Sequence, residues 1–148
     1  MVRFETFLVP HDFSDDAEAA LEAAVELARR LGARLHLLHV YQQPVDVLSP
    51  YGVAIQPNVG PELRAAAQGR LQQLAARISG VRVELHVAEG PPALAIAEQA
   101  QSLGADLVVM GTHGRTGLRH LLLGSVAERT MRTAPCPVLT VKAAGAAA

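Results

Sequence analysis

The sequence predicts a single α/β domain built on one doubly wound, five-stranded parallel sheet with helices on both faces. Short apolar runs alternate along the chain with longer segments whose apolar residues recur at helical spacing. Proline or glycine separates most of these segments. Such an alternation of strands and helices favours a mostly parallel sheet. The 148 residues, half of them apolar, suit one domain, which we place at 1–142, followed by a disordered alanine-rich tail at 143–148.

The first strand and the first helix are marked by local signals at both ends. The apolar run FLVP at 7–10 ends at a proline, and a helical segment at 14–32 follows it. Ser14 or Asp15 can cap the start of this helix, and Gly32 marks its end. The apolar stripe expected to face the core consists of Leu21, Ala24, Val25, Ala28 and Leu31.

The later elements continue the alternation. Further strands are expected at 34–41, 81–87, 106–111 and 136–142, and further helices at 63–78, 91–104 and 125–134. The stretch 42–60 is punctuated by proline and glycine and has no period. It is therefore expected to be a loop, with three roles open: a lid, a dimer contact or a merely mobile connection.

The order of the strands predicts where a ligand would bind. Right-handed crossovers leave few topologies, of which we expect the flavodoxin-like order 3-2-1-4-5. The chain then reverses its direction of winding between the first and fourth strands, and a crevice opens at their carboxyl ends. Pro10, His11 and Asp12 follow the first strand, and 111–114 follow the fourth. The two segments are therefore expected to meet in one crevice.

The loop at 111–125, GTHGRTGLRHLLLGS, is unusually rich in glycine. Gly111 and Gly114 can adopt backbone angles that other residues avoid, and without a Cβ they let an anion approach the main chain. Gly124 and Ser125 stand at the start of the next helix, where unpaired N–H groups and the helix dipole favour a phosphate. The alternative is that the glycines only permit the turn.

Two better-known phosphate loops do not fit this stretch. A P-loop ends in Gly-Lys-Ser or Gly-Lys-Thr, whereas here Leu123 precedes Gly124 and the only lysine is Lys142. The dinucleotide fingerprint requires glycines in the first strand-helix turn, and the turn PHDFSDD has none.

The spacing Gly111-x-x-Gly114, nine residues and then Gly124-Ser125 resembles the nucleotide-binding signature of the universal stress protein family, in its ATP-binding branch. The resemblance extends over nearly the whole chain, through FLVPHDFSDDA, LHLLHVY and PCPVLTVK. It implies the adenine nucleotide α-hydrolase-like variant of the predicted fold.

The resemblance also implies a set of nucleotide-binding residues. The phosphates would lie on the glycine loop, and the acidic residue after the first strand, Asp12, would contact the ribose or a phosphate-bound metal. The implied phosphate site comprises Gly111, His113, Gly114, Arg115, Gly124, Ser125 and Val126, and the implied adenine site comprises Pro10, His11, Val40 and Met110. Family members often have Gly-Ser after this acid, whereas Phe13-Ser14 follow here, and a phenylalanine can tighten the mouth of the pocket.

The function implied by the resemblance is that of a small cytoplasmic module that binds ATP, with Mg²⁺ on the phosphates, and signals through its conformation or assembly. It also implies a homodimer formed through the last strand, 136–142. Two alternatives stay open: an enzyme that slowly hydrolyses ATP or transfers its phosphate, and a protein-interaction module without a nucleotide. Asp12 is the one crevice carboxylate that the sequence identifies, so we assign no catalytic residue.

Composition bounds the remaining possibilities. The net charge of −1 argues against nucleic acid as a partner, and no apolar run is long enough to span a bilayer. The single cysteine and the lack of a secretory pattern favour the cytoplasm. The histidines show no metal-binding spacing, because His36 and His39 would point to opposite faces of one strand, so we assign no metal site. His11 and His113 are expected in the crevice, as ligands of the nucleotide or, alternatively, as an acid-base pair.

Overall fold

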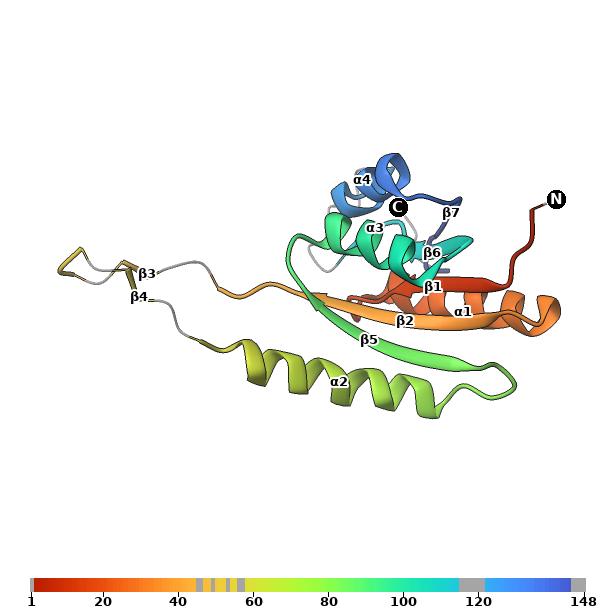
Figure 1. The fold of residues 1–148 in the computed structure, drawn as a ribbon, viewed down its shortest axis with the longest axis horizontal. Helices are drawn as coiled ribbons and strands as arrows, with labels where there is room; N and C mark the ends of the chain where they lie inside the picture. Colours follow the sequence, from red (N-terminus) through yellow and green to blue (C-terminus); the bar gives the residue numbers. More distant parts are fainter. Residues whose placement is uncertain are drawn as a thin grey trace.

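A computed structural model describes residues 2–44, 47–48, 50–52, 54–55, 58–114 and 122–144 (Figure 1). Its main sheet has five parallel strands in the order β5-β2-β1-β6-β7. This confirms the predicted order 3-2-1-4-5. The elements are β1 (Thr6–Pro10), α1 (Asp15–Leu31), β2 (Arg34–Tyr41), β3 (Val47–Leu48), β4 (Ala54–Ile55), α2 (Gly60–Ala76), β5 (Val83–Glu89), α3 (Pro92–Leu103), β6 (Leu107–Gly111), α4 (Ser125–Thr133) and β7 (Val138–Val141).

Two apolar clusters hold the helices on the two faces of the sheet. One cluster joins α1 and α2 to alternate residues of the strands, including Phe7, Leu35 and Val109. The other joins α3 and α4 to the residues between them, including Leu8 and Leu38. Figure 1 shows the same layering, with α3 and α4 on the opposite side of the strands from α1 and α2. The central strands are buried on both faces, which explains why they read as unbroken apolar runs.

The ends of α1 lie where the sequence signals place them. The Ser14 hydroxyl accepts a hydrogen bond from the Ala17 N–H at 3.2 Å, and Gly32 closes the helix in the left-handed conformation at φ 68°. One expected core residue is wrong: Leu31 is 52% exposed. It is the last residue of α1, next to the C-cap Gly32.

The predicted loop 42–60 contains a feature that its composition did not indicate. β3 and β4 pair as a separate antiparallel two-stranded sheet, with Val47 opposite Ile55. Figure 1 shows this small sheet lying apart from the five-stranded sheet.

The register of the sheet creates the crevice. β1 ends at Pro10, opposite Leu38, whereas its neighbour β2 continues to Tyr41. On its other side β1 pairs with β6, whose last residue is Gly111. The chain leaves both β1 and β6 at the same edge, so the segments that follow them face each other there.

Two further features bear on the predicted boundaries. The Ala143 N–H, at the start of the predicted tail, donates to Asp16 Oδ1 at 3.0 Å, and 145–148 lie outside the described residues. Within the part of the chain that the structure describes, no helix has both the length and the apolar character to cross a membrane.

Candidate functional site

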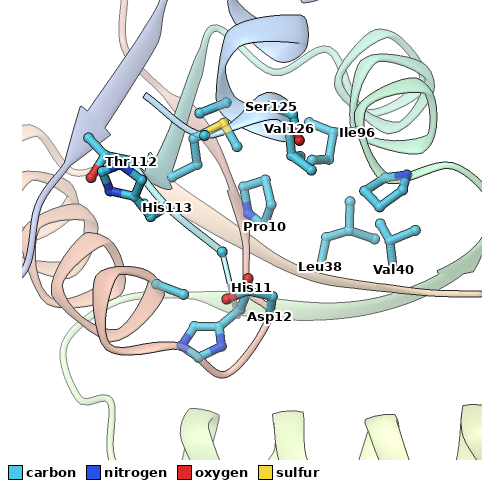
Figure 2. A pocket seen from close by; sticks show the side chains of 17 residues that line it. Pro10, His11, Asp12, Leu38, Val40, Ile96, Thr112, His113, Ser125 and Val126 are labelled. Carbon is cyan, nitrogen blue, oxygen red and sulfur yellow. The ribbon is translucent and has the colours of Figure 1, made fainter. Parts of the chain in front are cut away.

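A cavity of about 200 Å³ opens at the carboxyl ends of β1 and β6 (Figure 2). It is several times the roughly 30 Å³ that one water occupies, so it can hold more than a hydration site. Its lining residues come from β1, β2, β6, the first turns of α1, α3 and α4, and the loops between them. They are Pro10, His11, Asp12, Ala17, Leu38, Val40, Pro92, Ile96, Met110, Gly111, Thr112, His113, Gly114, Gly124, Ser125, Val126 and Ala127.

The structure brings the predicted site residues together around this cavity. Every residue of the predicted set that is described lines it, from Pro10 through Val126. The remaining member, Arg115, lies outside the described residues.

Sequence reasoning missed several lining residues. Leu38 stands two positions before Val40 on β2, and alternate residues share a face of a strand, so this signal was available. Pro92 and Ile96 come from α3, and only the packing of that helix against β2 brings them to the cavity.

The buried carboxylate of Asp16, in the first turn of α1, fixes the shape of the site. Its Oδ2 accepts hydrogen bonds from the Thr112 hydroxyl at 2.8 Å and from the His113 N–H at 3.1 Å, and the His113 ring Nδ1 lies 3.3 Å away. Its Oδ1 accepts from the Ala143 N–H at 3.0 Å. One side chain therefore holds the loop after β6 and the chain after β7 against α1.

These contacts also fix the charge of Asp16. Burial alone would raise the pKa of this carboxyl, but hydrogen bonds from Ala143, Thr112 and His113 outweigh it and hold the pKa below its ordinary value. Asp16 is therefore a carboxylate at neutral pH, and its hydrogen bonds position Thr112 and His113 at the start of the loop.

Two glycines of the loop, Gly111 and Gly124, are required for close packing, and the special backbone angles expected at Gly111 and Gly114 are not found. Gly111, Gly114 and Gly124 all lie outside the left-handed region. A Cβ on Gly111 would lie 2.8 Å from the backbone carbonyl carbon of Asp16, and one on Gly124 would lie 3.0 Å from the carbonyl oxygen of Thr112. These two glycines let β6 and α4 approach their neighbours.

Gly114 differs from these two because its missing side chain leaves space beside a carboxylate. A Cβ there would lie 2.9 Å from Asp12 Oδ2. The other oxygen of Asp12, Oδ1, accepts a hydrogen bond from the Ser14 N–H at 3.0 Å. Asp12 therefore has one oxygen turned to its own helix start and the other turned to the loop.

The two crevice histidines contact other residues of the protein. The His11 ring is 0% exposed, its Nδ1 accepts from the Phe13 N–H at 3.0 Å, and Figure 2 shows it turned away from the other lining side chains. Burial lowers the pKa of His11, and the nearby carboxylates of Glu18 and Asp12 oppose this only in part. The His113 side chain is 7% exposed and contacts Asp16.

Phe13 does not tighten the mouth of the cavity as expected, because it is not among the lining residues. Its ring lies 5.1 Å from the His11 ring and 4.8 Å from the His39 ring, and the Arg70 guanidinium lies over it at 3.7 Å. Its backbone has φ 66°, a conformation that glycine adopts readily and a bulky residue adopts at a cost of about 1 kcal/mol. The contacts with the two tilted histidine rings and with the cation offset that cost.

The first turn of α4 presents backbone N–H groups to the cavity. Gly124 is its N-cap, and no side chain among the described residues caps it. Ser125, Val126 and Ala127 of this turn all line the cavity. By contrast, Ser14 caps α1 with its side chain. Of these two helix starts, that of α4 is therefore the better suited to receive an anion.

Comparisons with known proteins agree on one family. Residues 3–142 match the profile of the universal stress protein family. Universal stress protein MJ0531 of Methanocaldococcus jannaschii is 36% identical over 144 residues, which cover 94% of this chain and 82% of that protein. The universal stress protein in the QAH/OAS sulfhydrylase 3′ region of Thermus aquaticus is 36% identical over 141 residues, 94% of this chain and 99% of that protein.

Solved structures give the same result. Protein MJ0577 superposes with a TM-score of 0.82 at 28% identity, over 95% of this chain and 97% of that chain. The universal stress protein UspA from Lactobacillus plantarum gives a TM-score of 0.75 at 28% identity, over 95% and 99%. A universal stress protein in complex with cAMP gives 0.67 at 25% identity, over 96% and 99%.

Replacing Asp16 tests its structural role. Asp16→Asn removes the charge and turns two acceptor oxygens into one acceptor and one donor, which leaves buried N–H groups unpaired. We expect the free energy of unfolding to fall by about 3 kcal/mol in urea denaturation. Asp15→Asn, at the exposed neighbouring position, is the matched control and should cost less than about 1 kcal/mol. Equal losses in the two variants would contradict the role given to Asp16.

The pH dependence of the same comparison gives an independent test. The folded pKa of Asp16 is lowered, so its contribution is present above the unfolded pKa of about 3.9 and is lost as the pH falls through the folded pKa. The difference in unfolding free energy between wild type and Asp16→Asn should therefore be largest above about pH 5 and shrink below pH 4. A difference that does not change down to pH 3 would contradict it.

Proposed function

Because the chain belongs to the universal stress protein family, we propose that it is a regulatory module that binds ATP, together with Mg²⁺, in the crevice between β1 and β6. The observation that carries the proposal is the cavity itself, which joins an apolar slot to an uncapped helix N-terminus. The relative crystallised in complex with cAMP supports an adenine nucleotide as the class of ligand.

The phosphate groups would lie at the start of α4. Ser125 and Val126 present N–H groups at the positive end of the helix dipole, and Gly114 leaves room beside them on the loop. Asp16 holds the loop residues Thr112 and His113 in place before any ligand arrives. Such a prearranged site loses less conformational entropy when it binds.

The adenine ring would lie in the apolar part of the cavity, against Leu38, Val40 and Ile96. The backbone of β2 also has polar groups to offer there. The Leu38 carbonyl accepts from the His11 N–H at 2.7 Å, so Leu38 directs its backbone groups toward β1. Val40, two residues further along β2, also directs its N–H and C=O toward the β1 side. β1 ends at Pro10, opposite Leu38, so the strand does not extend as far as Val40. One donor and one acceptor can then pair with the edge of the base.

Asp12 fits the chemistry of a magnesium ion bound to the phosphates. Mg²⁺ prefers carboxylate, phosphate and water oxygens. The space that a Cβ on Gly114 would fill lies 2.9 Å from Asp12 Oδ2, on the phosphate side of the crevice. When bound, the ion would neutralise phosphate charge, and Asp12 would supply its protein ligand.

We propose binding rather than rapid hydrolysis as the activity. Asp12 is the one carboxylate among the described lining residues, and it already accepts a hydrogen bond from Ser14. Asp16 is buried and occupied by the loop. The described residues therefore offer no second carboxylate in the cavity to activate a water molecule. ATP bound in the crevice would affect other proteins through the conformation of the loop and α4.

A carboxylate placed at the start of α4 tests the phosphate site. Ser125 is exposed and is the first residue of the helix, where a glutamate favours the folded state through the dipole. Ser125→Glu should therefore keep or raise the melting temperature while repelling phosphate. We expect ATP affinity, measured by calorimetry with Mg²⁺, to fall at least 100-fold, equivalent to about 2.7 kcal/mol.

Two control variants separate charge from position. Ser125→Ala removes only the hydroxyl and should change affinity less than about fivefold. Gln101→Glu adds the same charge on the exposed surface of α3 and should leave binding unchanged. Unchanged ATP affinity in folded Ser125→Glu would contradict the phosphate site, and no saturable binding by nucleotide-free wild type would contradict the proposal itself.

We also propose that the chain forms a homodimer through its last strand. β7 is an edge of the sheet, so its outer backbone groups have no partner strand within the main sheet. It also carries Leu139, which is 37% exposed. A second copy placed along β7 would pair the edge and cover this side chain.

A charge on this strand tests the dimer. Leu139→Glu should shift the protein from dimer to monomer in size-exclusion chromatography with light scattering, because two carboxylates would face each other across the contact. Leu94→Glu, at a position 55% exposed on α3, is the control and should leave the dimer intact. A monomeric wild type, or a Leu139→Glu variant that stays dimeric, would rule out this contact.

A further inference from the structure

Three side chains that commonly bind metals lie together on β2 and β5, outside the crevice. In the register of these strands His36 is opposite Glu84, and Leu38 is opposite His86. Alternate residues of a strand share a face, so His36, Glu84 and His86 all lie on the face that carries Leu38, the face covered by α3. Among the described residues this is the one group of three or more such side chains whose ligand atoms converge.

The distances within this cluster are those of a nearly formed coordination sphere. His36 Nδ1 lies 2.9 Å from His86 Nε2 and 3.1 Å from Glu84 Oε2, and all three ligand atoms lie within 4.8 Å of one another. A tetrahedral zinc ion with bonds of about 2.0–2.1 Å holds neighbouring ligand atoms about 3.3 Å apart. The two distances from His36 differ from this value by a few tenths of an ångström, and rotation of the half-exposed Glu84 side chain would adjust the third, between Glu84 and His86.

Protons alone do not satisfy these contacts well. A neutral imidazole has one N–H, so His36 Nδ1 either donates to one of its two neighbours or accepts from His86 while its lone pair faces Glu84. A single dication would satisfy all three lone pairs at once.

Burial gives the cluster an inner wall and an open side. The His36 side chain is 6% exposed and that of Glu84 is 54% exposed. The inner imidazole is therefore held by the core, while the carboxylate borders solvent, from which an ion can enter and a water can complete its coordination. Two imidazoles with one carboxylate suit zinc and its first-row neighbours, whereas Mg²⁺ and Ca²⁺ prefer oxygen ligands alone.

We propose that His36, Glu84 and His86 bind a divalent transition-metal ion of the zinc class, which joins the edge strand β5 to β2. The site is independent of the proposed nucleotide function, because none of its three residues lines the crevice. The proposal departs from the sequence-based assignment of no metal site. Spacing along one strand could not reveal ligands that come from two strands.

Titration with ZnCl₂ tests the proposal. The protein is used full-length, free of affinity tag and nucleotide, and stripped with a chelator. We expect calorimetry to give one Zn²⁺ per chain and the melting temperature to rise with Zn²⁺ concentration. His86→Gln should weaken Zn²⁺ binding at least 100-fold and abolish the rise in melting temperature.

Two further variants complete the design. Glu84→Gln changes a half-exposed side chain, so it should fold normally and weaken Zn²⁺ binding at least tenfold. His39→Gln removes a histidine from the opposite face of β2, where its Nδ1 contacts the His11 carbonyl oxygen, and should bind Zn²⁺ as the wild type does. Circular dichroism establishes that each variant is folded.

Cobalt absorption distinguishes this site from loose surface binding. Co²⁺ in a four-coordinate site absorbs visible light far more strongly than hydrated octahedral Co²⁺, and this band should appear in the wild type and be lost in His86→Gln. No saturable Zn²⁺ binding by the wild type would overturn the proposal. So would unchanged binding in folded His86→Gln and Glu84→Gln, which would place the ion elsewhere. Neither result bears on ATP binding, which is measured separately.

Discussion

The structure depends on one buried carboxylate, because Asp16 joins three parts of the chain that are far apart in sequence. It lies in the first turn of α1 and accepts hydrogen bonds from Thr112 and His113 after β6 and from Ala143 after β7. Each bond satisfies a donor in the protein interior and keeps Asp16 ionised. The start of the loop, at Thr112 and His113, is therefore attached to α1, and its position does not depend on a ligand.

Because Asp16 fixes the start of the loop, the other residues of the crevice have distinct roles. Gly111 and Gly124 permit the close packing that Asp16 fixes, since a Cβ on either would meet backbone atoms. His11 accepts a hydrogen bond from the Phe13 N–H, and the His113 ring contacts Asp16. The groups placed to meet a ligand are the start of α4, which no described side chain caps, the Asp12 carboxylate next to Gly114, and the apolar wall from β2 and α3. Together they suit a ligand with a flat apolar end and an anionic end.

Much of the fold could be predicted because buried parallel strands appear as apolar runs, and β2 lies at the predicted 34–41. β5 begins two residues later than predicted, because its pairing starts at Val83 opposite Leu35. Asp16 could not be recognised, since in sequence it resembles its exposed neighbour Asp15, an acid that suits any helix start. The convergence of His36 with His86 depends on the register of two strands separated by about 50 residues in the chain. Local patterns report burial and periodicity, but not which polar groups meet across the fold.

The central claim is that ATP binds with its phosphates at the start of α4 and its base against β2. Amide chemical shifts measured by NMR during titration with ATP and Mg²⁺ test it most directly, because they report every backbone N–H separately. The largest shifts are expected at Gly114, Ser125, Val126 and Val40, with little change at Gly80 and Gly104, which do not line the cavity. Saturable shifts that spare the first turn of α4 and gather elsewhere on the molecule would contradict it.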